Sequence, residues 1–452
     1  MPPRVPDLYV QPEWNDVHQV DRALRIASAA WGRRARLLLQ APASTLVQAR
    51  SLTTALLRRR FPLGALDQLS VGVLPAEAPL PPGALPLALR HGAPGFDCPE
   101  ALAAVLPRFT PPGLVWSRID PVDAPPVISV LIATHGRPRA LLGLLDALAA
   151  QVGRDGGLPP TFEVLLVDDG SAPPVADGLQ NDRWQLPLRL LQQQNAGPAA
   201  ARNLGLQWAR APLLLLLNDD AVPSPTLLAD HVAAHASEAA PTMWMGAFGL
   251  VPAQRADRFA ALVESTRLLF PQPCLPPGRW PGQVLCSGNA SLPTAALRAV
   301  GGFDPNIRAP GGEDTELGRR LEQVEGVGLR FDPRLACGHD HHLTCAGLAA
   351  RKTHLGQTVV YLADRFGDPS MLLPGGPPVD ALFDLKLERT LKRLQVDIGA
   401  LAATLDASCA AERAGGPALI PPARFDALVD DLSEAAYITG LLAGRRARAA
   451  AR

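Results

Sequence analysis

Acidic side chains follow two apolar, strand-like segments in the middle of this chain. Asp168 and Asp169 end the segment at 162–169, and Asp219 and Asp220 follow a run of five leucines. Because aspartate is seldom buried without a partner, adjacent carboxylates after such runs indicate ligand binding rather than packing. Hard divalent cations such as Mg²⁺ and Mn²⁺ prefer carboxylate oxygen and complete their shell with substrate phosphates. The pattern therefore favours a metal-assisted site for a phosphate compound.

A second group of charged residues lies at the predicted starts of two helices. Glu313 and Asp314 follow two glycines, which permit close approach of the backbone, and a helix N-terminus stabilises a carboxylate. Arg202 follows Gly197 in a segment whose first helical amides could hold an anion. Two structural alternatives stay open. Asp314 could be a plain helix cap, and Gly197 could only allow close packing of its helix.

Regular alternation of strand and helix must position these residues. Continuous apolar runs are typical of parallel strands that are covered on both faces, and the intervening segments have helical spacing. We therefore predict an α/β fold with a doubly wound mixed sheet, whose strand ends carry the acidic residues. The strands are expected at 127–134, 162–169, 188–193 and 213–219, and the helices at 140–151, 197–210 and 224–236.

The sequence divides into three predicted parts. Residues 1–120 form a small α/β accessory module, with strands at 34–41 and 68–75 and helices at 20–32 and 45–61, and they contain no glycine-rich phosphate loop. Residues 121–365 form the main domain, and residues 366–452 form a helical C-terminal region. The amphipathic segment 386–405 is more typical of a packing face than of a membrane anchor, but peripheral membrane contact stays open.

Charge and cysteine usage restrict the environment and the partners. Lys+Arg and Asp+Glu both number 43, so overall charge gives no basis for binding nucleic acid. The 6 cysteines are scattered, which favours free thiols in a reducing compartment. The first residues lack the apolar stretch of a signal peptide, and no apolar run approaches the length of a membrane span. We expect a cytoplasmic protein, in contact at most with the inner face of a membrane.

Taken in order, the motifs resemble those of family 2 glycosyltransferases with the GT-A fold. The resemblance implies that a sugar moves from a nucleotide-sugar donor to a hydroxyl acceptor with inversion, and that Mn²⁺ or Mg²⁺ is required. It covers about half of the chain and says nothing of which sugar or acceptor is used. The segments that carry it are ISVLIATHGRP (128–138), FEVLLVDDGS (162–171), NAGPAAARNLG (195–205), LLLLLNDD (213–220), GGFD (301–304), GGEDTEL (311–317) and PRLACGHDHH (333–342).

The resemblance also implies a role for individual residues. Asp314 is the implied general base, and Glu313 lies on the acceptor side. Asn218 stands where the family often has aspartate, which weakens the predicted metal affinity. The implied donor-binding residues are Thr134, Arg137, Asp169, Arg202 and Asp219, and the implied metal ligands are Asp220 and His339.

Three alternatives remain at the level of sequence. The cysteines and histidines between Cys337 and Cys345 could bind zinc, although they lack the usual paired spacings. The chain could be a non-catalytic glycosyltransferase-like scaffold that docks partners through its terminal regions. It could also be a nucleotidyltransferase, but the segment HGRP (135–138) is too short for the usual phosphate loop.

Overall fold

The computed structural model describes residues 113–118, 126–179, 184–372, 379–380 and 382–450 with their side chains, and four earlier strands by their backbone. Those strands form a parallel sheet in the order β3-β2-β1-β4. The strands predicted at 34–41 and 68–75 are confirmed by β2 and β3, whereas the helices predicted at 20–32 and 45–61 lie outside the described residues. The four strands are β1 (Leu8–Val10), β2 (Ala35–Ala41), β3 (Leu69–Pro75) and β4 (Leu85–Leu87).

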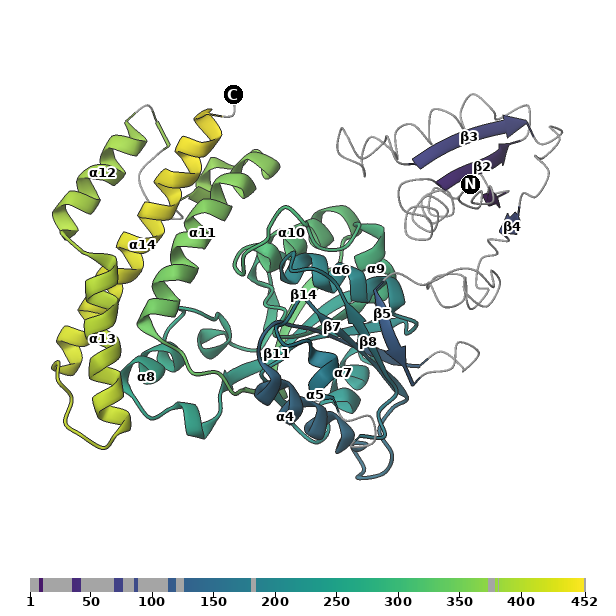
Figure 1. The fold of residues 1–452 in the computed structure, drawn as a ribbon, viewed down its shortest axis with the longest axis horizontal. Helices are drawn as coiled ribbons and strands as arrows, with labels where there is room; N and C mark the ends of the chain where they lie inside the picture. Colours follow the sequence, from purple (N-terminus) through teal and green to yellow (C-terminus); the bar gives the residue numbers. More distant parts are fainter. Residues whose placement is uncertain are drawn as a thin grey trace.

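A mixed ten-stranded sheet forms the centre of the described chain (Figure 1). Its order is β10-β14-β11-β13-β9-β6-β7-β8-β5, and β12 pairs with β14 at the side. The neighbours of β6 and β7 run parallel, while β13 and β5 run antiparallel to the strands beside them. The strands are β5 (Leu114–Ser117), β6 (Ile128–Thr134), β7 (Phe162–Asp168), β8 (Leu188–Gln192), β9 (Leu213–Asn218), β10 (Ala221–Pro223), β11 (Thr242–Leu250), β12 (Gly278–Trp280), β13 (Asn289–Pro293) and β14 (Gly328–His339).

Helices cover both faces of this sheet, which confirms the predicted doubly wound fold. Successive strand residues point to opposite faces, so Leu131 of β6 packs with α6 while Val130 packs with α4. Apolar residues on both faces explain why these strands read as continuous hydrophobic runs. The helices around the sheet are α4 (Pro138–Ala149), α5 (Val175–Gly178), α6 (Pro198–Trp208), α7 (Leu227–Ala236), α8 (Arg258–Ser265), α9 (Thr294–Ala299) and α10 (Glu313–Glu325), with short 3-10 turns at Pro252–Gln254, Gln272–Cys274 and Gly282–Val284.

The predicted helical C-terminal region is confirmed, and it forms a bundle of four helices whose first helix, at 345–366, precedes the predicted start of that region. Its two central helices approach each other closely, because a Cβ atom on Gly356 would lie 2.2 Å from the Tyr437 carbonyl oxygen, and one on Gly440 would lie 1.9 Å from that of Thr353. None of the described helices combines the length and hydropathy that crossing a membrane requires. The helices are α11 (Cys345–Phe366), α12 (Phe383–Leu394), α13 (Ile398–Arg413) and α14 (Pro422–Ala450), with a 3-10 turn at Pro369–Leu372.

Helix α11 ends at the predicted domain boundary near residue 366 but packs with both of the parts that the boundary separates. Its first turns pack into the core beneath the sheet through Cys345 and Leu348, and its later turns pack on α14 through Val359 and Val360. The helical region is thereby joined to the sheet domain by a continuous helix. The amphipathic segment 386–405 is not one helix, because Gln395 adopts φ 50° and Asp397 caps a new helix through the amide of Ala400.

A buried ion pair links two neighbouring strands of the sheet. Glu163 and Arg189 are 1% and 0% exposed, and the Arg189 Nη1 atom lies 2.6 Å from the Glu163 Oε2 atom. The other oxygen of Glu163 accepts hydrogen bonds from the Ser129 hydroxyl and the Arg210 amide. Removal of the negative charge would therefore take the carboxylate of Glu163 away from a buried guanidinium.

We predict that Glu163→Gln lowers the free energy of unfolding by about 3–5 kcal/mol, because it breaks a buried pair and keeps the other charge. Denaturant unfolding monitored by circular dichroism measures the change. Glu388→Gln is the matched control, since Glu388 pairs with Arg446 on the surface and an exposed pair contributes less than about 1 kcal/mol. Equal effects of the two substitutions would contradict this account of the sheet.

Candidate active site

The carboxyl ends of β6, β7 and β9 meet at one edge of the sheet, where a cavity of about 450 Å³ opens. Parallel strands bring the residues that follow them to the same edge, which is where α/β sheets bind ligands. All nine residues that the sequence singles out as a site line this cavity. They are Thr134, Arg137, Asp169, Arg202, Asp219, Asp220, Glu313, Asp314 and His339.

The residues after β6 hold the acidic pair that follows β9. The Thr134 hydroxyl donates to the Asp219 Oδ2 atom at 2.8 Å, and the Arg137 Nη1 atom lies 3.2 Å from Asp219 and 2.6 Å from Asp220. Burial raises the pKa of Asp219, while the charge of Arg137 opposes this shift. The predicted donor-side residues Thr134 and Arg137 therefore orient the two carboxylates in addition to lining the cavity.

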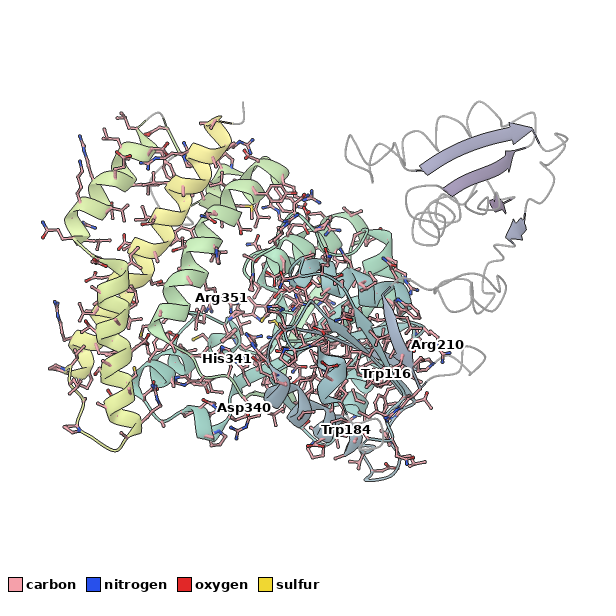
Figure 2. The ribbon with its side chains drawn as sticks, viewed as in Figure 1. Trp116, Trp184, Arg210, Asp340, His341 and Arg351 are labelled. Atoms are coloured by element: carbon pink, nitrogen blue, oxygen red, sulfur yellow. The ribbon has the colours of Figure 1, made fainter. Side chains whose placement is uncertain are left out.

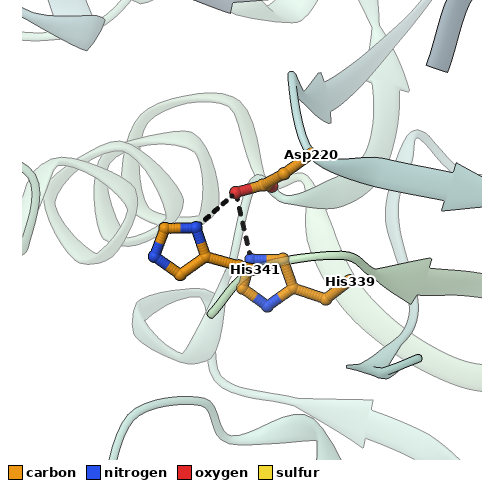
Figure 3. A group of neighbouring side chains, drawn as sticks. All are labelled: Asp220, His339 and His341. Carbon is orange, nitrogen blue, oxygen red and sulfur yellow. Dashed lines mark ion pairs between the residues drawn. The ribbon is translucent and has the colours of Figure 1, made fainter. Parts of the chain in front are cut away.

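Asp220 forms a compact group with two histidines, shown in Figure 3. The Asp220 Oδ2 atom lies 3.3 Å from the His339 Nε2 atom and 3.1 Å from the His341 Nδ1 atom. Burial alone would raise the pKa of Asp220, but the hydrogen bonds from both imidazoles outweigh it and hold the pKa well below its usual range. The two rings stack in parallel, with centroids 5.3 Å apart.

The chemistry of this group fits a divalent metal ion. The three ligand atoms lie within 4.8 Å of one another, and the buried Asp220 Oδ1 atom accepts no hydrogen bond among the described residues. Such an oxygen is costly to bury unless a cation or another partner satisfies it. His339 is held in place by stacking on Phe248 at 4.5 Å.

His341 is a candidate ligand that the sequence analysis considered only for the alternative zinc site and not beside Asp220 and His339. His339 ends β14, and His341 follows at the spacing of two that puts side chains on one side of an extended chain. This spacing was the available signal. The alternative zinc cluster is not formed, since no cysteine belongs to the metal-ligating group found in the described residues. Burial also raises the pKa of the Cys337 thiol, which opposes the thiolate that zinc requires.

The two aspartates after β7 have different partners. Asp168 accepts from the backbone amides of Ser171 and Val175, so it closes the turn. Asp169 accepts from the amides of Ala196 and Gly197, each at 2.9 Å, and faces the cavity. Asp169 therefore positions the loop that leads into α6 as well as the cavity wall.

Arg202 connects the acidic segment after β9 with the start of α10. Its Nη2 atom lies 3.4 Å from the Asn218 Oδ1 atom, and its Nη1 atom lies 3.4 Å from Glu313 and 3.9 Å from Asp314. Phe303 supports the guanidinium through a cation–π contact. The asparagine at 218, where the family often has aspartate, here serves as an acceptor for this arginine.

Asp314 is held by one carboxylate oxygen at the first turn of α10. Its Oδ2 atom accepts from the Ser287 amide at 3.0 Å, while its buried Oδ1 atom accepts no hydrogen bond among the described residues. Burial, and then the neighbouring charge of Glu313, raise the pKa of Asp314 to about 6, although Arg202 and Ser287 oppose the shift. Such a carboxyl group is suited to take up a proton near neutral pH.

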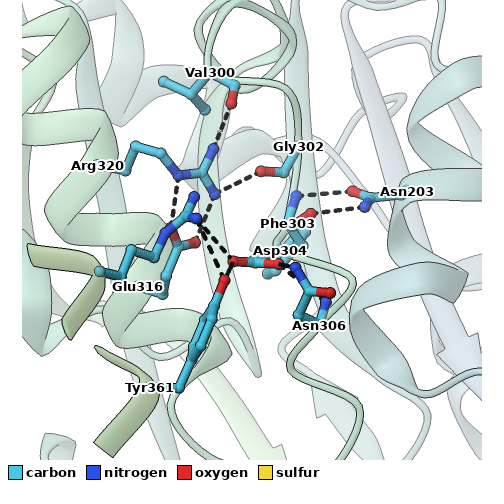
Figure 4. A network of polar contacts seen from close by, with 10 residues as sticks. Asn203, Val300, Gly302, Phe303, Asp304, Asn306, Glu316, Arg320 and Tyr361 are labelled. Atoms are coloured by element: carbon cyan, nitrogen blue, oxygen red, sulfur yellow. Dashed lines mark hydrogen bonds and ion pairs between the residues drawn. The ribbon is translucent and has the colours of Figure 1, made fainter. Parts of the chain in front are cut away.

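A polar network fixes α10 against α11 (Figure 4). Glu316 of α10 forms ion pairs with Arg320 at 2.6 Å and with Arg365 of α11 at 2.8 Å. Arg365 also lies 3.2 Å from Asp304, which accepts a hydrogen bond from Tyr361. The segment GGFD (301–304) thus ties the helix that carries Asp314 to the C-terminal helices.

Helix α11 contributes a cavity wall that the sequence analysis assigned to no function. Arg351 lines the cavity, with its guanidinium carbon 5.2 Å from the centre of the Phe270 ring. Phe270 in turn meets His339 edge to face at 5.2 Å. In Figure 2, Arg351 and His341 lie between the helical region and the sheet. No periodicity in the sequence relates α11 to the strand ends, so this contact depends on the tertiary fold.

Comparison with known proteins confirms the family. Residues 129–250 match the model of glycosyl transferase family 2. Validoxylamine A glucosyltransferase from Streptomyces hygroscopicus subsp. limoneus is 29% identical over 256 residues, covering 50% of this chain and 55% of the relative. Pre-mycofactocin glycosyltransferase from Mycobacterium tuberculosis is 30% identical over 230 residues, covering 48% of this chain and 46% of the relative. The chain therefore carries a family 2 glycosyltransferase domain.

These matches are partial. The chain spans about half the length of the curated relatives that it matches. The segment that matches the family model contains Asp169 and Asp220 but neither Asp314 nor His339. Among solved structures, a mannosyltransferase from Pyrobaculum calidifontis in complex with GDP-Man and Mn²⁺ is 19% identical, with a TM-score of 0.40, covering 74% of this chain and 89% of that one. A likeness of this size says nothing of the ligands of this chain.

We predict that His341→Ala weakens Mn²⁺ binding by at least roughly 10–100-fold. Loss of a residue that only supports a metal ligand already has an effect of this size, and loss of a ligand should have a larger one. Electron paramagnetic resonance of the free ion measures the affinity. His342→Ala is the matched control, because His342 lines the same cavity but lies outside the group of three ligands. Equal Mn²⁺ affinity of the two variants would remove His341 from the metal site.

Proposed function

We propose that this protein is a metal-dependent inverting glycosyltransferase that moves a sugar from a nucleotide-sugar to a hydroxyl group. One observation carries the proposal. A single cavity unites a three-residue metal-ligating group with a buried carboxyl group whose pKa is about 6. The first suits a compound with a charged diphosphate, and the second suits deprotonation of an alcohol.

The donor occupies the part of the cavity formed by the strand ends. We assign Asp169 to the nucleobase and Asp219 to the ribose, with Thr134 and Arg137 forming the entry to the pocket. Arg202 lies between Asn218 and Asp314, and we assign its guanidinium to the diphosphate. These assignments rest on two grounds: the family resemblance, and the fact that all of these residues line the same cavity.

Asp220, His339 and His341 would hold the metal ion, which offsets the charge of the departing diphosphate when it is bound. Two imidazoles and one carboxylate form a mixed nitrogen and oxygen set, whereas Mg²⁺ takes oxygen ligands in most sites. Mn²⁺ is therefore the ion that we propose, and Mg²⁺ is the weaker substitute.

Transfer begins when the acceptor hydroxyl gives its proton to the Asp314 Oδ1 atom. The hydroxyl oxygen forms a bond to the anomeric carbon while the bond from that carbon to the diphosphate oxygen breaks. Arg202 stabilises the negative charge that develops on the leaving diphosphate. Because one displacement from the opposite side completes the reaction, the anomeric configuration inverts. Glu313 positions Arg202 and the turn before α10, since its Oε2 atom accepts from the Gly311 amide at 2.7 Å.

The sugar and the acceptor stay open. The names of the two relatives give one glucosyl group and two different acceptors, so neither a sugar nor an acceptor passes from them to this chain. The scaffold and nucleotidyltransferase alternatives gain no specific support. Only residues 135–137 separate β6 from α4, which leaves no phosphate loop of the kind a nucleotidyltransferase would carry.

We predict that Asp314→Asn lowers turnover by roughly 10²–10⁴-fold, the usual contribution of a positioned general base, while donor affinity is retained. Transfer from a panel of nucleotide-sugars to the acceptor, together with donor titration, measures both quantities. Asp397→Asn is the control, because Asp397 only caps α13 and asparagine caps a helix about as well. Near-normal turnover by a folded Asp314→Asn protein would exclude Asp314 as the base.

We also predict that kcat/KM falls about tenfold per pH unit below pH 6, because the base works only when deprotonated. Glu313→Gln removes a negative neighbour of Asp314 and frees Arg202, so the pKa of Asp314 should fall and the acid limb should move to lower pH. A pH profile of kcat/KM for the two proteins tests this. An acid limb at the same pH in both would contradict the coupling between Glu313 and Asp314.

A further inference from the structure

Helix α12 presents an outward face of leucine and basic side chains that packs against no other described element. Leu382 and Leu385 are 57% and 43% exposed. Arg389, Lys392 and Arg393 follow at helical spacing on the same side and are also exposed. We call these five residues the basic leucine face.

The opposite side of α12 is the packing face. Phe383 and Leu387 are buried there, at 0% and 2% exposure, in a cluster with Ile438 and Leu441 of α14. The exposed leucines are therefore not required to hold α12 on the bundle. Single exposed leucines are common at protein surfaces, so these two indicate an interaction site only together with the cations beside them.

The acidic and the basic side chains of α12 lie on different sides of the helix. The acidic residues lie on the flank toward α14, where Asp384 pairs with Arg445 and Glu388 pairs with Arg446 at 2.7 Å. Lys386, at the margin of the basic leucine face, pairs with Asp380. Among the described residues, no carboxylate lies within ion-pair distance of Arg389, Lys392 or Arg393. The face thus combines exposed leucines with cations that have no counter-ion in the part of the chain that the structure describes.

We propose that the basic leucine face docks this protein on an anionic lipid bilayer. Amphipathic helices that lie in the plane of a membrane insert leucines between the headgroups, while lysine and arginine contact anionic lipids. A nucleic acid partner would use the cations but leave the leucines exposed, and the net charge of the chain is +0. The proposal is independent of the glycosyl transfer proposed above.

The place of α12 in the fold suits this role. In Figure 1 it lies at the outer edge of the helical region, with α14 and α11 between it and the sheet. None of the residues that line the cavity belongs to α12. Docking through this face therefore leaves the residues that line the cavity free of the membrane contact.

Co-sedimentation of the full chain with vesicles tests the proposal. The protein should bind vesicles of phosphatidylcholine mixed with phosphatidylglycerol, should not bind phosphatidylcholine alone, and should dissociate as salt is raised. Replacement of Arg389, Lys392 and Arg393 by glutamine should weaken the binding roughly a hundredfold, since each charge near an anionic surface contributes to it. Leu382→Ser with Leu385→Ser should also weaken it.

A charge-matched control separates a specific face from general attraction. Arg154, Arg334 and Arg424 are exposed elsewhere, and their replacement by glutamine removes the same charge. This control should bind vesicles like the unchanged protein, and all variants should keep its melting temperature. Failure of the unchanged protein to bind the anionic vesicles would overturn the proposal. Equal loss in the control, or binding of duplex DNA in place of vesicles, would overturn it as well.

Discussion

The active-site region depends on how the fold holds five carboxyl groups close together at one edge of the sheet. Asp169, Asp219, Asp220, Glu313 and Asp314 share the lining of one cavity, where like charges repel and burial penalises ionisation. Backbone amides hold Asp169, Arg137 holds the pair after β9, and Arg202 lies between Asn218 and the start of α10. Each of these acidic side chains therefore has a positive or donating partner from another element, and Arg137 and Arg202 each serve two of them.

Asp220 and Asp314 have different numbers of positive and donating partners, and this gives the two aspartates different tasks. Asp220 receives two imidazoles and an arginine, which hold its pKa low and keep it a carboxylate, as a metal ligand must be. At Asp314, burial and then the charge of Glu313 outweigh one backbone amide and a distant arginine, so its pKa rises to about 6. When the surroundings give two similar carboxyl groups very different pKa values, the group with the raised pKa takes the acid–base role. The group with the lowered pKa stays charged and takes the electrostatic role.

Much of the site could be predicted because the motifs end strands or begin helices. Thr134, Asp169 and Asp220 reach one edge simply because their strands run parallel or lie beside parallel strands, and this follows from the apolar runs. The place of His341 could not be predicted in the same way, because it requires β14 to pair with β10 beside Asp220. The place of Arg351 is even harder to predict from the sequence, because α11 reaches the cavity only by packing on the core beneath the sheet. The break at Gln395 also escaped prediction, because a non-glycine residue with positive φ has no clear sequence signal.

The central claim is that a divalent ion and a nucleoside diphosphate bind this cavity together. Isothermal titration of UDP and GDP, with Mn²⁺ and then with excess EDTA, tests it most directly, because linkage requires each ligand to raise the affinity of the other. We expect at least one nucleotide to bind tightly with Mn²⁺ and weakly with EDTA, and we expect Asp220→Ala to bind it weakly in both. Equal affinity of the unchanged protein with Mn²⁺ and with EDTA would contradict the account.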